Sequence, residues 1–145
     1  MVTSIKKEGT EIERKYLVFD IPFDPDEFER HEIMQGYLQL NPEIRIRKKG
    51  NQYSLTMKGD GALTRPETIE EISPQEFEEL SEGILGTMVR KIRYNTPLGN
   101  GLIAELDIYN GILGRVSLVT VEVEFISVDM AKDFVAPSWF GPEIT

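Results

Sequence analysis

Charged residues recur in this sequence at alternate positions, in short blocks of one sign. Two blocks pair carboxylates and two pair cations. They are Glu11 and Glu13, Glu122 and Glu124, Arg45 and Arg47, and Lys91 and Arg93. Because successive side chains of a β-strand point to opposite faces, each block places two like charges on one face, roughly 7 Å apart. Carboxylate pairs suit Mg²⁺ or Mn²⁺, and Arg and Lys pairs suit phosphate oxygens. A polyphosphate with its metal ions would satisfy both kinds of block.

The same alternation extends to seven further charged residues. They are Lys15, Lys58, Arg65, Glu67, Glu71, Glu105 and Asp107. For any single strand, the simplest interpretation is an open sheet or sandwich whose charged face is solvated, with its apolar face in the core. The pattern alone does not decide which face points inward. If the sheet closes into a barrel with the charged face inside, it forms a polar tunnel.

Turn signals separate the alternating runs and predict an antiparallel sheet. Gly50-Asn51, Gly59-Asp60-Gly61 and the segment 97–101 are typical of hairpin connections. About eight strands follow from this spacing, so the predicted fold class is α+β with β dominant.

Three short helices are predicted from their caps. Asp24 and Ser73 each precede a proline and a Glu at the third helical position, as in a capping box. A third helix is predicted from near Asp129 through Phe134. The prolines of residues 136–142 exclude regular structure there.

Length and composition limit the class of protein. With 145 residues the chain is predicted to form a single domain over 1–145, and it has no cysteine for a thiolate site or disulfide. A net charge of −9 argues against a nucleic-acid partner. No apolar run suggests a signal peptide or membrane span, so no membrane partner and a cytoplasmic location are expected.

Taken together, these blocks resemble the CYTH superfamily, the triphosphate tunnel metalloenzymes. The opening Glu11-Ile12-Glu13-Arg14-Lys15 resembles the Glu-x-Glu-x-Lys signature of the family's first strand. The resemblance continues in order along nearly the whole chain. Its further segments are Gln35-Gly36-Tyr37-Leu38, Ile44-Arg45-Ile46-Arg47, Leu55-Thr56-Met57-Lys58, Lys91-Ile92-Arg93-Tyr94, Glu105-Leu106-Asp107-Ile108-Tyr109, Val121-Glu122-Val123-Glu124-Phe125 and Trp139-Phe140-Gly141.

The resemblance implies an eight-stranded antiparallel closed β-barrel around a charged tunnel, with a few short helices outside. It implies metal binding by Glu11, Glu13, Glu122 and Glu124, with Asp107 supporting or joining them. The implied phosphate-binding residues are Lys15, Arg45, Arg47, Lys58, Arg65, Lys91 and Arg93. The implied catalytic residues are Glu11, Glu13, Lys15, Glu122 and Glu124, and Glu67, Glu71 and Glu105 are secondary tunnel carboxylates. The strand of Arg65 and Glu67 departs from the family, because Ile69 stands where a further Glu is frequent.

The implied activity is hydrolysis of the terminal phosphoanhydride of a triphosphate, assisted by Mg²⁺ or Mn²⁺ and involving two ions. Inorganic tripolyphosphate is favoured as substrate, because the opening motif is most similar to the bacterial tripolyphosphatase branch. The alternatives are a nucleoside or thiamine triphosphatase, a class IV-type adenylyl cyclase, and a noncatalytic polyphosphate-binding module. A homodimer is possible, as relatives are often dimers.

Three single residues and the end of the chain carry further expectations. His31 is expected to be a solvated residue in a loop-like stretch, and Trp139 to pack the tail onto the barrel end. Tyr37 either faces the tunnel or is structural. Relatives usually continue past the Trp-Phe-Gly segment into a polar helix that plugs one tunnel mouth. Because this sequence stops at Thr145, one mouth is expected to be more open.

Overall fold

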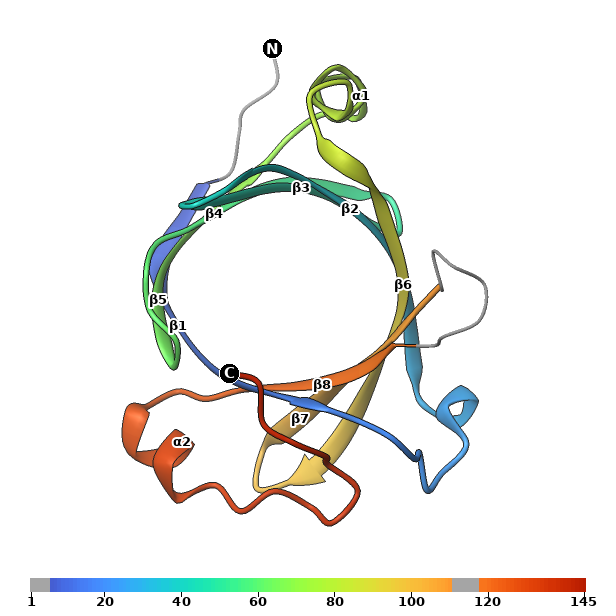
Figure 1. Ribbon diagram of the computed structural model, residues 1–145, viewed down its shortest axis with the longest axis vertical. Helices are drawn as coiled ribbons and strands as arrows, with labels where there is room; N and C mark the ends of the chain where they lie inside the picture. Colours follow the sequence, from blue (N-terminus) through green and yellow to red (C-terminus); the bar gives the residue numbers. More distant parts are fainter. Residues whose placement is uncertain (1–5, 111–117) are drawn as a thin grey trace. The chain divides into compact units, whose positions relative to one another are not determined.

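The computed structural model describes residues 6–110 and 118–145, and in this part of the chain eight strands form a closed barrel (Figure 1). The strands follow one another around it in the order β1-β5-β4-β3-β2-β6-β7-β8. Their bounds are β1 Lys6–Leu17, β2 Glu29–Leu40, β3 Glu43–Lys49, β4 Gln52–Lys58, β5 Thr64–Glu71, β6 Leu85–Gly99, β7 Leu102–Tyr109 and β8 Val119–Glu124. The predicted eight-stranded antiparallel closed barrel is therefore confirmed.

The hairpin turns lie where the glycines and asparagines predicted them. Gly50, between β3 and β4, has a φ of 58°, and Asn100 and Gly101, between β6 and β7, have φ values of 53° and 76°. These left-handed conformations are the ones that Gly and Asn tolerate best, which explains why the turns form at these positions.

The helices agree with the prediction in place, with two differences in detail. Helix α1 spans Pro74–Ser81, and Ser73 and Glu76 form the predicted capping box. The capping box predicted at Asp24 is wrong, because Asp24 accepts a hydrogen bond from the Asp26 amide and the segment makes only a 3₁₀ turn, η1, over Pro25–Glu27. Helix α2 spans Val128–Asp133, so Phe134 caps its end instead of lying within it.

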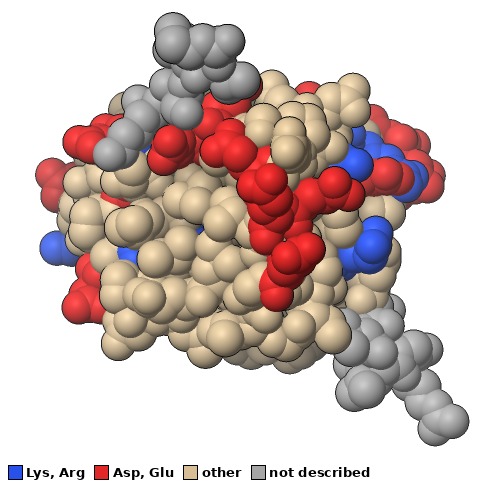
Figure 2. All heavy atoms as spheres, turned by 90° about the horizontal axis from the view of Figure 1, so that it is seen from above, with Lys and Arg blue, Asp and Glu red and all other residues tan. Residues whose placement is uncertain are grey.

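Contacts divide the chain into two compact units, each built from separate segments. The first unit contains the described residues up to 10, with 32–61 and 65–90. Its core holds Ile46, Ile72 and Phe77, and Phe77 brings α1 onto the sheet through the ring of Tyr53, with centroids 5.2 Å apart. The outer surface of α1 is acidic, and Figure 2 shows the carboxylates gathered over this helix.

The second unit contains residues 11–31, 62–64, 91–110 and 118–145. Its core includes Leu106, Val121 and Val123, all fully buried. The tail runs beside β1, since the Gly141 amide donates to the Leu17 carbonyl at 2.7 Å. Trp139 packs against Phe23 with ring centroids 5.2 Å apart, which confirms its predicted role in holding the tail.

Arg14 ties this tail to the first strand. Its guanidinium makes two hydrogen bonds to the Glu143 carboxylate, at 2.9 and 2.7 Å. It also donates to the carbonyls of Ala131 and Phe134, and so covers the end of α2. Within the described residues, no helix is both long and apolar enough to cross a membrane.

Candidate functional site

Four charged side chains of the alternating pattern are buried, although they point away from the apolar cores. Lys58 is 5% exposed, Lys91 3%, Arg93 5% and Asp107 0%. A solvated outer face would leave such side chains accessible, so the interpretation as an ordinary solvated sheet is wrong for these positions. Because burying charges is costly without partners, the arrangement of signs around them decides what the site can bind.

In the second unit, strand register places the acidic blocks side by side. Glu13 on β1 lies opposite Glu124 on β8, and Lys15 lies opposite Glu122. Glu122 also lies opposite Glu105 on β7. The alternation that the sequence predicted thus becomes one continuous charged surface across these neighbouring strands.

Three of the predicted metal ligands come together. Carboxylate oxygens of Glu11, Glu13 and Glu124 all lie within 4.8 Å of one another. Hard divalent cations prefer oxygen ligands of this kind, and a cation among these oxygens would relieve the repulsion of the three carboxylates. The donor set therefore fits Mg²⁺ or Mn²⁺.

Glu122 is two residues before Glu124 in β8, but its carboxylate lies close to two cations. Its carboxylate is 3.4 Å from Lys15 Nζ and 3.9 Å from Arg93 Nη2. Burial alone would raise the pKa of Glu122, but the charges of Arg93 and Lys15 outweigh burial and hold that pKa well below its ordinary value. Glu122 therefore stays ionised at neutral pH. Burial would likewise lower the pKa of Lys15, but Glu122 and its neighbours raise it, so Lys15 stays charged.

The structure places Asp107 apart from the carboxylate cluster. Its oxygens accept hydrogen bonds from Lys91 Nζ at 2.7 Å and from Arg93 Nε and Nη2 at 2.8 and 2.9 Å. Of the two roles expected for Asp107, joining the metal ligands or supporting the site, this geometry favours support. Glu105 acts similarly, accepting from Arg93 Nη1 at 2.8 Å.

Two residues of this surface were missed among the candidate site residues. Tyr109 lies opposite Lys91, whose ammonium is 5.2 Å from the centre of the tyrosine ring, a cation–π distance. Thr120 lies opposite Asp107, is 1% exposed, and its hydroxyl has no hydrogen-bond partner among the described residues. The sequence did contain a signal for both. Tyr109 is two positions after Asp107, and Thr120 is two positions before Glu122, so each shares a strand face with a predicted site residue.

The first unit carries the basic block of Arg45 and Arg47. Arg47 donates from Nε and Nη2 to the Gln35 side-chain oxygen, at 3.2 and 3.0 Å. Arg45 lies opposite Tyr37 on β2, and its guanidinium is 3.4 Å from Glu43. Gln35 also donates to the Tyr37 hydroxyl at 3.4 Å, so Tyr37 belongs to the charged face.

Lys58 and Arg65 complete this basic group. Lys58 Nζ is 3.7 Å from Glu67, and Arg65 is 3.5 Å from Glu43 while it donates to the Gly59 carbonyl at 3.0 Å. Ile69 lies opposite Thr56, so this strand presents an apolar side chain at that position. The last predicted secondary carboxylate, Glu71, lies opposite Ser54 and is exposed.

The expectation for His31 was wrong about its surroundings. His31 lies in strand β2 and is half-buried, and its Nε2 is 3.0 Å from the Glu29 carboxylate. Phe28 is already extended and β2 begins at Glu29, so His31 lies inside the strand.

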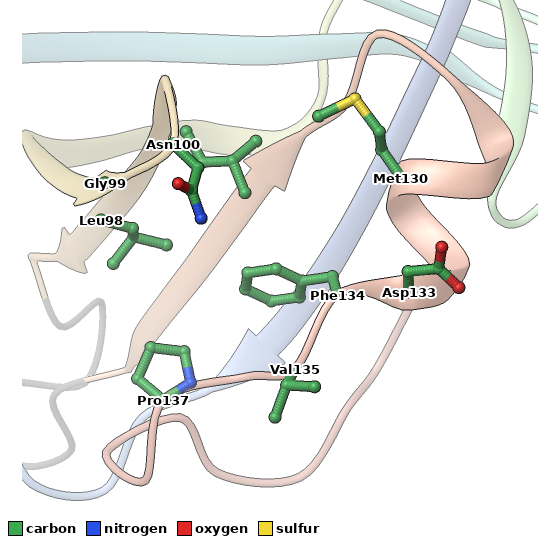
Figure 3. Close-up of a pocket in the computed structure, with 9 residues that line it drawn as sticks. Leu98, Gly99, Asn100, Met130, Asp133, Phe134, Val135 and Pro137 are labelled. Carbon is green, nitrogen blue, oxygen red and sulfur yellow. The ribbon is translucent and has the colours of Figure 1, made fainter.

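A separate pocket of about 410 Å³ lies in the second unit, between the β6–β7 turn and the end of α2 (Figure 3). Figure 3 shows Leu98, Phe134, Val135 and Pro137 around it, with Asp133 as its charged residue. This lining has one carboxylate and no cation, so it does not suit a phosphate.

Comparison with known proteins agrees with this geometry. The chain is 41% identical over 139 residues to an inorganic triphosphatase from Nitrosomonas europaea, covering 94% of this chain and 89% of that protein. The crystal structure of the inorganic triphosphatase NE1496 matches with a TM-score of 0.62 at 38% identity, covering 92% of this chain and 88% of that one. HpAC1 from Hippeastrum, a putative adenylyl cyclase described as having a dominant triphosphatase activity, matches in fold, with a TM-score of 0.63 at 19% identity over 84% and 82% of the chains. The CYTH domain model matches residues 9–132, and the chain belongs to the CYTH domain family.

Proposed function

We propose that this protein is a metal-dependent hydrolase that cleaves the terminal phosphoanhydride bond of a triphosphate, with inorganic tripolyphosphate as its main substrate. The observation that carries the proposal is the cluster of Glu11, Glu13 and Glu124, whose oxygens lie within 4.8 Å of one another in a chain that also buries paired cations. The 41% identity to an inorganic triphosphatase supports the choice of substrate.

Glu11, Glu13 and Glu124 would hold Mg²⁺ or Mn²⁺, and we assign Glu122, whose carboxylate lies 3.4 Å from Lys15 Nζ, to a second ion. When bound, these ions neutralise negative charge on the phosphates and activate the water that attacks the phosphorus atom. Glu122 is suited to metal binding, because its depressed pKa keeps the carboxylate ionised at neutral pH.

The cations of the second unit have distinct roles in this proposal. Lys15 is charged and lies 3.4 Å from Glu122, so it stands where metal-binding and phosphate-binding groups meet. Arg93 and Lys91 are held by Asp107, which fixes their direction before substrate arrives. Preorganised cations of this kind stabilise charge that shifts toward the leaving group during phosphoryl transfer.

The charged faces of the two units differ in sign, and this supports a division of labour. In the second unit carboxylates outnumber cations. The carboxylates are Glu11, Glu13, Glu105, Asp107, Glu122 and Glu124, and the cations are Lys15, Lys91 and Arg93. In the first unit Arg45, Arg47, Lys58 and Arg65 outnumber their partners Glu43 and Glu67. We assign metal binding to the acidic face and most of the phosphate binding to the basic one.

A protein that only bound polyphosphate would be served by the cations alone. Three carboxylates brought within 4.8 Å of one another repel, and they weaken the attraction for a polyanion unless a metal ion neutralises them. Their presence therefore favours turnover over simple binding.

The remaining expectations are part of the same proposal. We place the protein in the cytoplasm as a single 145-residue domain that acts on a small molecule and binds no nucleic acid, in keeping with its net charge of −9 and its acidic surface over α1 (Figure 2). Homodimerisation stays a prediction, which light scattering after size-exclusion chromatography would test.

Phosphate release from tripolyphosphate, ATP and thiamine triphosphate, each with Mg²⁺ and with Mn²⁺, tests the substrate assignment. Release from tripolyphosphate well above release from the other two is expected. Preferential release from ATP or thiamine triphosphate would overturn the assignment, and cyclic AMP formed from ATP would indicate a cyclase.

A further inference from the structure

A basic pocket of about 350 Å³ lies in the first unit, at one end of the charged face of β3 and β4. Its cations are Lys7, Arg47 and Lys49, and Glu71 is the single carboxylate among its lining residues. Gln52 and Ser54 add side-chain hydrogen-bond donors. The lining therefore has an excess of positive charge with neutral donors around it, which is the chemistry that recognises phosphate.

This pocket continues the row of predicted phosphate-binding residues. Arg45, Arg47 and Lys49 occupy alternate positions of β3 and so share one face, at intervals of roughly 7 Å. Register confirms the continuation, because Arg47 lies opposite Ser54 and Lys49 lies opposite Gln52 on β4. Arg47 thus belongs both to the phosphate-binding row and to the pocket.

The two lysines of the pocket are free to bind a ligand. Lys49 is half-buried and Lys7 is exposed, and within the described residues neither ammonium has a carboxylate partner. Lys58 and Arg45 differ in this respect, because Glu67 and Glu43 lie near them. A charged residue that is half-buried without an ion-pair partner favours an anionic ligand that would neutralise it.

The aromatic residue of the pocket is not available to stack on a nucleobase. The ring of Tyr53 packs against Phe77 with centroids 5.2 Å apart, and the Lys48 ammonium lies 5.7 Å from its centre. Because these two groups already occupy the ring, the pocket offers charge and hydrogen bonds but no stacking surface. Ile69 adds a small apolar wall where a carboxylate would have repelled phosphate.

We propose that Lys7 and Lys49 form an additional phosphate subsite beyond Arg47, so that the protein binds linear polyphosphates of four or more phosphates more tightly than tripolyphosphate. The proposal rests on the proposed function, because it extends the same phosphate-binding row. Each added internal phosphate brings one further negative charge, and this subsite supplies the matching cations.

The test compares tripolyphosphate, tetrapolyphosphate and ATP as ligands of the full chain by calorimetry, with chelator present so that binding is read without turnover. The variants are Lys49→Gln and Lys7→Gln. The control is Lys132→Gln, which removes the same charge from an exposed position on α2. If either pocket variant fails to fold, as judged by circular dichroism, the other still tests the subsite.

Wild-type protein is expected to bind tetrapolyphosphate more tightly than tripolyphosphate. Lys49→Gln should weaken tetrapolyphosphate binding about tenfold and tripolyphosphate binding about twofold or less. Lys132→Gln should leave both unchanged.

Equal losses for the two polyphosphates, no loss for either, or a loss for ATP as large as that for tetrapolyphosphate would overturn the subsite. Failure of the proposed function would appear elsewhere, as absence of metal-dependent phosphate release from tripolyphosphate.

Discussion

Asp107 and Arg93 lie opposite each other on β7 and β6, and the buried Asp107 carboxylate accepts two hydrogen bonds from the Arg93 guanidinium, at 2.8 and 2.9 Å. A third hydrogen bond, from Lys91 at 2.7 Å, completes the arrangement. One carboxylate that is 0% exposed thus holds two cations of the charged face in fixed directions. This geometry makes Asp107 a positioning residue.

Replacing Asp107 by Asn is expected to lower stability while leaving metal binding intact. The change leaves Arg93 and Lys91 buried without their main counter-charge, which costs about 3–5 kcal/mol in comparable buried pairs. Urea denaturation would measure this loss, and calorimetry with Mn²⁺ would show an affinity close to wild type. Asp133→Asn, at an exposed position, is the control. Loss of Mn²⁺ affinity with unchanged stability would instead make Asp107 a metal ligand.

Replacing Glu124 by Gln is expected to abolish most metal binding and activity. Removing one of three clustered carboxylates eliminates a charged ligand, and we expect at least a 100-fold loss of Mg²⁺-dependent phosphate release, on the order of the largest effects seen for residues that support metal ligands. Stability without metal should rise or stay unchanged, because repulsion within the cluster falls. Glu78→Gln, on the outer surface of α1, provides the matched control. Metal-dependent activity near the wild-type level in Glu124→Gln would contradict the assignment of the cluster.

The fork of hydrogen bonds between Arg47 and Gln35 predicts that arginine geometry matters as well as charge. Arg47→Lys keeps the charge but loses the planar fork that Gln35 orients, so the KM for tripolyphosphate is expected to rise about tenfold. Lys48→Arg, on the opposite face of the same strand, should leave KM unchanged. Equal KM values in wild type and Arg47→Lys would mean that this guanidinium does not contact substrate.

The depressed pKa of Glu122 predicts a specific pH dependence of stability. Because the pKa of the folded state lies below the ordinary value of 4.5, the contribution of ionised Glu122 is complete above about pH 5 and is lost as the pH falls through the folded-state value. The difference in free energy of unfolding between wild type and Glu122→Gln, measured without metal, should stay constant from about pH 8 to 5 and then shrink. A difference that grows on acidification would be inconsistent with the pairing of Glu122 with Lys15 and Arg93.

Much of the fold could be predicted because alternation and turn chemistry are local properties. Gly50 and Asn100 adopt the left-handed backbone that their residue types favour, and Ser73 with Glu76 closes a capping box within four residues. The capping box expected at Asp24 failed because Phe28 is already extended toward β2, so no helix continues beyond the first turn. His31 was misplaced for the same reason.

The candidate site was less predictable. Alternation along a strand shows which face of the sheet a side chain is on, but not which side chain of the neighbouring strand it contacts. Parity placed Asp107 with the glutamates, whereas its cross-strand neighbour Arg93 determines what its carboxylate binds. Gln35 and Tyr109 carry no charge, so the pattern of charges did not select them. Parity places them on the charged face, and register puts them beside Arg47 and Lys91. Register depends on tertiary structure, which local spacing does not encode.

The most direct test of the central claim is orthophosphate release from tripolyphosphate by wild type and by Glu13→Gln, with Mg²⁺ and with chelator. We predict rapid release by wild type with Mg²⁺, none with chelator, and a loss of at least about 100-fold in Glu13→Gln. Release that persists in chelator, or that Glu13→Gln retains at the wild-type rate, would contradict metal-dependent hydrolysis at this carboxylate cluster.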